Sequence, residues 1–286
     1  MLIVTSDEAK ARKMCDDASF FNKEAIYYPA KDAIFYSADV HGNQITGERL
    51  RCISRIINHS STGEGVLTVV TTMDGIADRL IPVERFKEAV ITLDYSSEIE
   101  PEKLAKKLVA MGFVRTGMVE DKGQFAIRGG IIDIFSYTDE APVRIELWDT
   151  EVDSIRMFDV ESQRSIERLQ SYSIFPATEY IFTEDELKNG LYNIKEECDR
   201  QLECFDYGKR KRTKEQIEAG NNLNKLVADV ERTGNYEKFT DTLVADTVGL
   251  AEYFPEENTL VVLDEPNRLK ECNELTLYEY NESMKN

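Results

Sequence analysis

The amino-acid sequence predicts an α/β protein: a parallel β-sheet covered by helices, with a smaller α+β domain of antiparallel strands inserted into it. Three observations support this fold class. Strand-like and helix-like segments alternate over residues 1–88, as in parallel sheets. Short strand-like segments separated by turn residues dominate residues 89–175. A buried-type strand returns within residues 176–286, so the first and third parts can share one sheet.

The first part begins with the strand "LIVTS", and Ser6 is expected to cap a helix from Asp7 to about Asp17. "AIYYPA" and "VLTVVTT" are the next strands, and a short helix is expected at Asp74–Leu80. Between these two strands, "GERLRCISRIINH" has the period of an amphipathic helix. Its apolar stripe consists of Leu50, Ile53, Ile56 and Ile57.

The second part opens with a helix in "EPEKLAKKLVAMGF", where Pro101 suits the first turn and Gly112 suits the C-terminal cap. Turn residues such as Gly129–Gly130 then separate short strands. The expected strands are Val114–Val119, Gln124–Arg128, Ile131–Phe135, Val143–Trp148, Val152–Phe158 and about Ser171–Phe175.

The third part is helical from Thr183 to about Phe205 and again from about Thr213 to Thr233. Between these helices, "KRKRTK" (Lys209–Lys214) is either a phosphate or targeting patch or a solvated loop, and the loop is the expected alternative. "NTLVVLDEPNRL" is a buried strand, and "LTLYEY" (Leu275–Tyr280) is expected to be another strand.

Charge and composition narrow the class of protein. The chain has 286 residues, of which 35 are basic and 54 acidic, and its net charge is −19. Such a chain repels phosphate backbones unless basic residues gather in a patch, so a protein partner is a better expectation than nucleic acid. Five scattered cysteines favour reduced thiols in a cytoplasmic protein, and two histidines far from any cysteine pair argue against zinc. The start and the short apolar runs predict neither a signal peptide nor a membrane span.

The segment "LVVLDEP" has the form of a Walker B strand, whose carboxylates hold Mg²⁺ beside a nucleotide. That chemistry needs a P-loop, G-x-x-x-x-G-K-[ST], and the sequence contains none: the only Gly-Lys pair, Gly208–Lys209, is followed by Arg210. Asp264 and Glu265 are therefore expected to be relics of that motif or to form a strand-end turn, rather than to bind a metal. We predict no catalytic residue, no cofactor and no metal for this chain.

The strand Val143–Trp148 raises a question about its polar face. A period of two places Arg144, Glu146 and Trp148 together on the side opposite Val143, Ile145 and Leu147. Tryptophan and arginine often dominate protein interfaces, so this face can be a docking surface. Alternatively, Trp148 lies half-buried against the domain's helix, and Arg144 pairs with Glu146 or with a neighbouring strand.

Residues 125–180 resemble the module shared by the repair helicase UvrB and the transcription-repair coupling factors (Mfd proteins). The resemblance rests on "RGGIIDIF", "VRIELWDTEVDSIR", "FDVESQRS" and "IFPATEY". "VLTVVTTMDGIADRLIP" and "EYFPEENTLVVLDEP" resemble the two halves of the RecA-like domain that encloses this module. Glu186–Asp241 carries little of the resemblance.

The resemblance implies a degenerate RecA-like (P-loop-NTPase-like) domain that lacks the P-loop and is formed by residues 1–88 and 176–286. It also implies that residues 89–175 bind UvrA, the damage-recognition ATPase. The family's contact residues fall on Arg128, Arg144 and Trp148, the last of which stands where the family more usually has Phe. UvrB's DNA-clamping hairpin has no counterpart, because "PAKDAIFYSADVHGNQITGERL" is too short.

The chain resembles the N-terminal fragment of a longer protein, so we expect a non-catalytic module that recruits UvrA to stalled RNA polymerase. The full-length family is an ATP-dependent DNA translocase, and RNA polymerase and DNA would be bound through other domains. The alternative is an ATP-dependent, UvrB-like helicase domain, which saturable ATP binding would reveal. A DNA-binding module is a third alternative, marked by a steep salt dependence of affinity.

Overall fold

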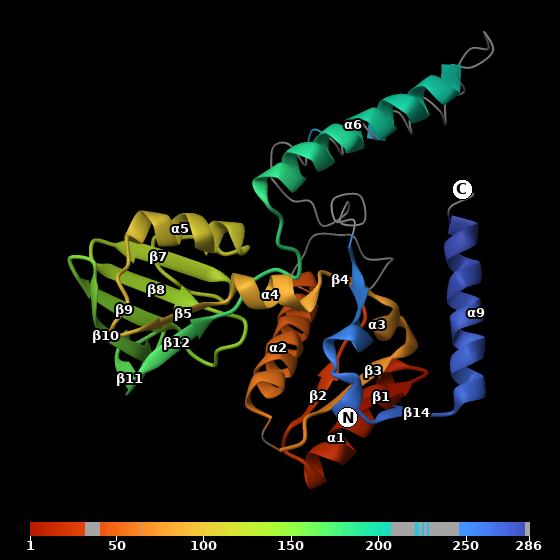
Figure 1. Ribbon diagram of the computed structural model, residues 1–286, viewed down its shortest axis with the longest axis horizontal. Helices are drawn as coiled ribbons and strands as arrows, with labels where there is room; N and C mark the ends of the chain where they lie inside the picture. Colours follow the sequence, from red (N-terminus) through yellow and green to blue (C-terminus); the bar gives the residue numbers. More distant parts are fainter. Residues whose placement is uncertain are drawn as a thin grey trace. The chain divides into compact units, whose positions relative to one another are not determined.

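The computed structural model describes residues 1–31, 41–63, 65–206, 221–222, 225, 228 and 246–283 (Figure 1). The chain divides into two compact units. Met1–Ile181 and Val248–Asn286 form the first unit, and Phe182–Thr247 form the second. The expected basic segment Lys209–Lys214 and most of the expected helix Thr213–Thr233 lie outside the described residues.

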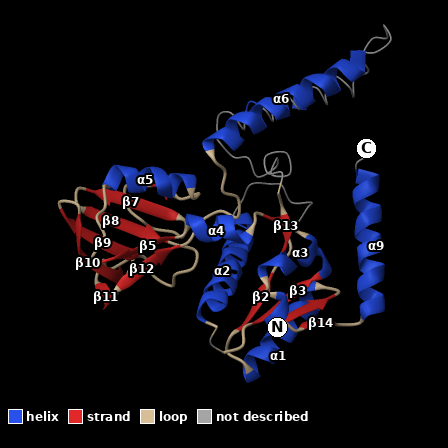
Figure 2. Cartoon of the chain, in the orientation of Figure 1, coloured by secondary structure: helices blue, strands red, loops and turns tan. Residues whose placement is uncertain are grey.

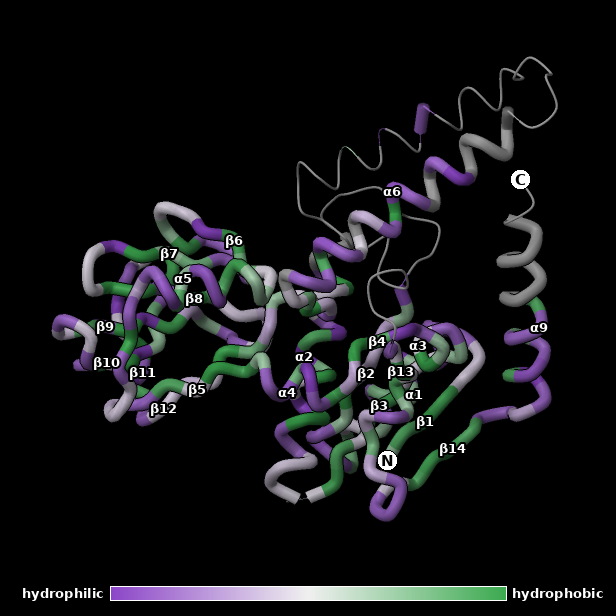
Figure 3. The backbone as a smooth tube through the Cα atoms, turned by 45° about the horizontal axis from the view of Figure 1, so that its top comes forward, coloured by the Kyte–Doolittle hydropathy of each residue, from purple (hydrophilic) through white to green (hydrophobic). Residues whose placement is uncertain are grey.

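The first unit contains a four-stranded parallel sheet in the order β14-β1-β3-β2 (Figure 2). Leu2 of β1 lies opposite Val261 of β14, so strands from the beginning and the end of the chain pair in one sheet, as expected. Both strands are hydrophobic along most of their length (Figure 3). The strands are β1 (Leu2–Thr5), β2 (Ala25–Tyr28), β3 (Thr68–Thr72) and β14 (Val261–Leu263).

Five helices accompany this sheet: α1 (Glu8–Phe21), α2 (His41–Thr62), α3 (Met73–Ala77), α4 (Val83–Ala89) and α9 (Pro266–Ser283). The predicted cap of α1 is wrong by one residue. Asp7 is the N-cap, because its carboxylate accepts the Lys10 N–H at 2.9 Å, while the Ser6 hydroxyl donates to Asp7. The predicted stripe of α2 is confirmed, since all four of its residues are buried.

The predicted strand at Leu275–Tyr280 is also wrong, because these residues lie within α9. Its threonine and two tyrosines suit a strand by propensity, whereas its two leucines are good helix formers. However, Pro266 fits the first helical position, and the segment continues a helix that has already begun there.

The β-rich part of the unit is a six-stranded sheet in the order β11-β10-β9-β8-β7-β6. Neighbouring strands are antiparallel except β6 and β7, which are parallel. β6 covers only Val114–Arg115, shorter than expected, and β11 was not expected. The other strands are β7 (Gln124–Arg128), β8 (Ile131–Phe135), β9 (Val143–Trp148), β10 (Glu151–Phe158) and β11 (Ser165–Arg168).

One face of this sheet is covered by the unit's own elements. Helix α5 (Pro101–Ala110) and the antiparallel pair β5 (Ile91–Asp94) and β12 (Ser171–Ile174) contribute to a common apolar core with the strands. Leu108, Ile132, Ile145 and Ile174 are among its fully buried members. Pro101 opens α5 and Gly112 follows it at φ 87°, as predicted. The opposite face of the sheet carries the polar side chains together with a smaller apolar cluster that includes Ala126 and Phe135.

The first unit also contains four short elements: β4 (Arg79–Leu80) pairs with β13 (Val248–Gly249), and 3₁₀ turns lie at Leu250–Tyr253 and Glu256–Asn258. The second unit contains α6 (Glu184–Asp206), which confirms the helix predicted from Thr183 to about Phe205. Among the residues that the structure describes, we find no helix that is both long and apolar enough to cross a bilayer.

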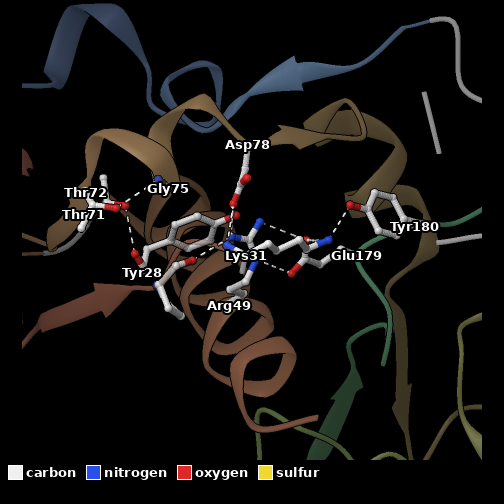
Figure 4. A network of polar contacts seen from close by, with 10 residues as sticks. Tyr28, Lys31, Arg49, Thr71, Thr72, Gly75, Asp78, Glu179 and Tyr180 are labelled. Carbon is white, nitrogen blue, oxygen red and sulfur yellow. Dashed lines mark hydrogen bonds and ion pairs between the residues drawn. The ribbon is translucent and has the colours of Figure 1, made fainter. Parts of the chain in front are cut away.

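A buried ionic cluster holds the segment that leaves the β-rich part (Figure 4). Glu179, just after β12, accepts from Arg49 of α2 at 2.5 Å and 3.1 Å and pairs with Lys31 at 2.9 Å. Arg49 also donates to Asp78 at 2.6 Å and lies over the Tyr28 ring. The cluster therefore joins four chain segments at one point.

Candidate functional site

The candidate site is the polar face of the six-stranded sheet, opposite its core. The strand register aligns Asp133 with Arg144, Arg144 with Arg156, and Arg156 with Arg168. Because directly opposed residues of paired strands project to the same side, these four side chains form one row across the sheet. Three arginines and one carboxylate thus lie on the same side of the sheet.

Asp133 brings the two predicted arginines together. Its carboxylate is buried and accepts from Arg128 Nη2 at 2.5 Å, Arg144 Nε at 2.6 Å and Arg144 Nη2 at 2.8 Å. The bonds from Arg144 use both carboxylate oxygens, which is the strong bidentate geometry. The hydrogen bonds with Asp133 raise the pKa of Arg144.

The Arg128 and Arg144 side chains differ in how much of their surface is exposed to solvent. The Arg144 side chain is 12% exposed, because it also donates to Gln163 Oε1 at 2.8 Å and lies over the Phe158 ring at 4.2 Å. The Arg128 side chain, at the end of β7, is 41% exposed. Arg144 is therefore held rigidly, whereas Arg128 presents more of its charge.

Trp148 is open to solvent at the end of β9. The residue is 79% exposed, although indoles usually bury most of their area. It precedes a two-residue hairpin whose first turn residue, Asp149, has φ 58°. Helix α5 lies on the core face of the sheet, so the alternative in which Trp148 packs half-buried against this helix is wrong.

The other part of that alternative was that Arg144 pairs with Glu146 or with a neighbouring strand, and the neighbouring strand is confirmed. Arg144 does not pair with Glu146 of its own strand but with Asp133 of the neighbouring strand β8. Glu146 instead pairs with Arg156 of β10 and accepts the Ser154 hydroxyl at 2.8 Å. The polar face thus contains two separate ionic groups, one around Asp133 and one around Glu146.

Asp133 was not singled out from the sequence, although a signal was present. It is the one acidic residue in "IIDIF", and the period of two places it opposite the core residues Ile132 and Ile134. A charge at that position of an otherwise apolar strand calls for a cationic partner. The identity of that cation follows only from the register in which β8 pairs with β9, which places Asp133 opposite Arg144.

The strand-end carboxylates Asp264 and Glu265 lie elsewhere, beside α1. Lys10 Nζ lies 2.5 Å from Asp264 and 2.8 Å from Glu265, and the Thr5 hydroxyl donates to Asp264 at 2.8 Å. The hydrogen bond from Lys10 lowers the pKa of Asp264. An ammonium group thus occupies the place where a cation would meet these carboxylates. The described part of the chain contains no group of three or more potential metal ligands.

Comparisons with known proteins agree with this architecture. Residues 91–180, which span β5 to the segment after β12, match the UvrB interaction domain. Over 285 residues and 96% of its length, the chain is 34% identical to the transcription-repair-coupling factor of Bacillus subtilis. Over its whole length it is 31% identical to that of Staphylococcus haemolyticus.

The chain spans about a quarter of the length of these relatives, 23% and 24% respectively. Within that span, the similarity covers the parallel sheet as well as the β-rich part. The chain is therefore similar over nearly its whole length to a region of the transcription-repair-coupling factors, and its residues 91–180 match the UvrB interaction domain.

Proposed function

We propose that this chain is a non-catalytic module that binds the excision-repair protein UvrA and thereby recruits it to stalled RNA polymerase. One observation carries the proposal: a tryptophan that is 79% exposed lies on the same strand face as Arg144, beside the turn that follows Arg128. This surface is part of the segment that matches the UvrB interaction domain.

The chemistry of this surface suits a protein partner. Exposed Trp and Arg are the residue types that most often dominate binding energies. The indole offers a large apolar area, and a guanidinium offers paired donors to a partner carboxylate. Arg128, Arg144 and Trp148 are accordingly the residues that we assign to UvrA binding.

We further propose that residues 89–175 are the UvrA-binding domain and that residues 1–88 and 176–286 form a degenerate RecA-like domain. The parallel pairing of β1 with β14, the missing P-loop motif and the Lys10 ion pairs support a domain without nucleotide chemistry. RNA polymerase and DNA contacts, and ATP-dependent translocation, would belong to other domains of a full-length, cytoplasmic protein.

The test is a titration of the purified chain against immobilised UvrA. Trp148→Ala should weaken binding by about 2 kcal/mol or more, roughly 30-fold, with an unchanged melting temperature. Ile166→Ala is the matched control, because Ile166 is also an exposed apolar residue of the same sheet. Arg115→Ala, at the exposed end of the sheet, is the control for an arginine.

Two outcomes contradict the proposal. Unchanged capture of UvrA by the folded Trp148→Ala variant would contradict the assignment of this surface to UvrA binding. Saturable ATP binding by the chain would instead favour the helicase alternative. Both measurements use the whole 286-residue chain, with or without the substitution, and neither requires an excised domain.

A further inference from the structure

Asp133 is a buried carboxylate in an apolar strand. Its side chain is 1% exposed, and its neighbours Ile132 and Ile134 are fully buried. Burying an ionised carboxylate costs several kcal/mol unless cations and hydrogen bonds compensate it. A hydrophobic residue would suit the strand better if the only requirement were a stable fold.

The compensation comes from two strands at once. Arg128 of β7 and Arg144 of β9 both donate to the carboxylate, which lies between them on β8. Two like charges would otherwise repel each other on this face. Two guanidinium groups on one carboxylate leave a net charge of +1, and this charge lies on the side of the sheet that carries Trp148.

Arg144 is fixed from three directions. Asp133 holds its Nε and Nη2, Gln163 accepts from Nη2, and the Phe158 ring lies beneath the guanidinium plane. The Gln163 amide is itself held, because its Nε2 donates to the Val160 carbonyl at 2.8 Å. A side chain fixed in this way loses little rotamer entropy when a partner binds.

We propose that Asp133 is a positioning residue for UvrA binding: it holds Arg128 and Arg144 in the orientation in which a carboxylate of the partner receives them. This inference rests on the proposed function and adds a residue that does not itself touch the partner. Its consequence is that the ion pairs within the chain prepare the arginines for binding rather than withdrawing them from it.

The decisive experiment compares Asp133→Asn in two backgrounds, by titration against UvrA. In the otherwise unmodified chain, this change should weaken binding about tenfold or more, and Asp133→Glu should recover part of the loss. In the Arg128→Ala/Arg144→Ala background, Asp133→Asn should change the affinity less than about twofold, because nothing is left to position. An equal loss in both backgrounds, or no loss in the folded single variant, overturns the inference.

A measurement on the unmodified chain covers the case in which Asp133→Asn does not fold. By ¹⁵N relaxation, the Arg144 Nε–H should have an order parameter near 0.85, about that of rigid backbone, while the exposed Arg115 Nε–H should fall below about 0.6. A mobile Arg144 overturns the inference.

The two proposals can fail separately. If the unmodified chain does not capture UvrA, both fall. If it captures UvrA, loses affinity with Trp148→Ala and keeps full affinity with folded Asp133→Asn, only the positioning role falls.

Discussion

Two buried carboxylates in this molecule each bind arginine in a bidentate manner, with different results. Glu179 and its partner Arg49 are both buried, and Lys31 and Asp78 complete their surroundings. Asp133 is equally buried, but one of its arginines, Arg128, is 41% exposed. In the Glu179 cluster the bound arginine is fully buried, whereas in the Asp133 cluster one of the bound arginines reaches solvent.

The difference lies in where the arginines come from. Arg49 projects from α2 into a junction of four chain segments, where the Pro29 carbonyl accepts another of its N–H groups at 2.7 Å. Arg128 of β7 and Arg144 of β9 project from the two strands that flank β8, onto the face opposite the core to which α5 contributes. The same kind of ion pair therefore ties chain segments together in one place, whereas in the other it is the one that we propose presents charge to UvrA.

The comparison predicts its largest effect for Arg49→Met. Removing this cation leaves Glu179 buried beside Lys31 alone, which should lower the free energy of unfolding by about 3–5 kcal/mol. Urea denaturation measures the change, and Arg115→Ala, which breaks an exposed pair, should cost less than about 1 kcal/mol. At a temperature where Arg49→Met is still folded, its affinity for UvrA should be unchanged. A selective loss of UvrA binding would mean that the Glu179 cluster also takes part in recognition.

Arg144→Ala should affect both UvrA binding and stability. It removes a contact assigned to UvrA and should weaken binding by about 2 kcal/mol. It should also lower the free energy of unfolding by about 1–3 kcal/mol, because Asp133 keeps only Arg128. Trp148→Ala should also weaken UvrA binding, but it should leave the free energy of unfolding unchanged, since the indole is exposed. Calorimetry and UvrA titration on both variants check this, and equal stabilities for both would contradict it.

Acid should reveal the Glu179 ion pairs by a smaller effect on stability. Burial favours a raised pKa for Glu179, but the charges of Arg49 and Lys31 outweigh burial and hold its pKa below the ordinary value of 4.5. A carboxylate with a depressed folded pKa contributes stability above the unfolded pKa and loses it as the pH falls through the folded value. Glu179→Gln should therefore flatten the fall in unfolding free energy below pH 4.5. Burial raises the pKa of Asp78, so this neighbour acts in the opposite direction. A profile of unchanged slope would contradict the assignment to Glu179.

Much of the fold could be predicted from local sequence patterns, but the ionic clusters around Asp133 and Glu179 could not. Strands β7, β8 and β9 begin and end where alternation predicts, because alternate residues such as Phe125, Ile132 and Ile145 face one core. β11 was missed because all four of its residues are exposed, so no alternation marks it. Arg128, Arg144 and Trp148 came from the resemblance together with the strand period. Their link through Asp133 depends on the register of three strands, and Arg49 meets Glu179 across 130 positions of sequence.

The smallest effect is expected from Arg156→Ala, on the same sheet face as Arg144. Its pair with Glu146 is partly exposed, so its loss should cost at most about 1 kcal/mol of stability. Because Arg156 lies directly opposite Arg144, removing it also relieves a repulsion between like charges, which offsets part of that cost. UvrA affinity should change less than it does for Arg144→Ala, since Arg156 pairs with Glu146 while Asp133 continues to hold the other two arginines. If both variants lose the same affinity in the UvrA titration, the recognition surface extends across β10, and attachment to Asp133 is not what selects the arginines that bind.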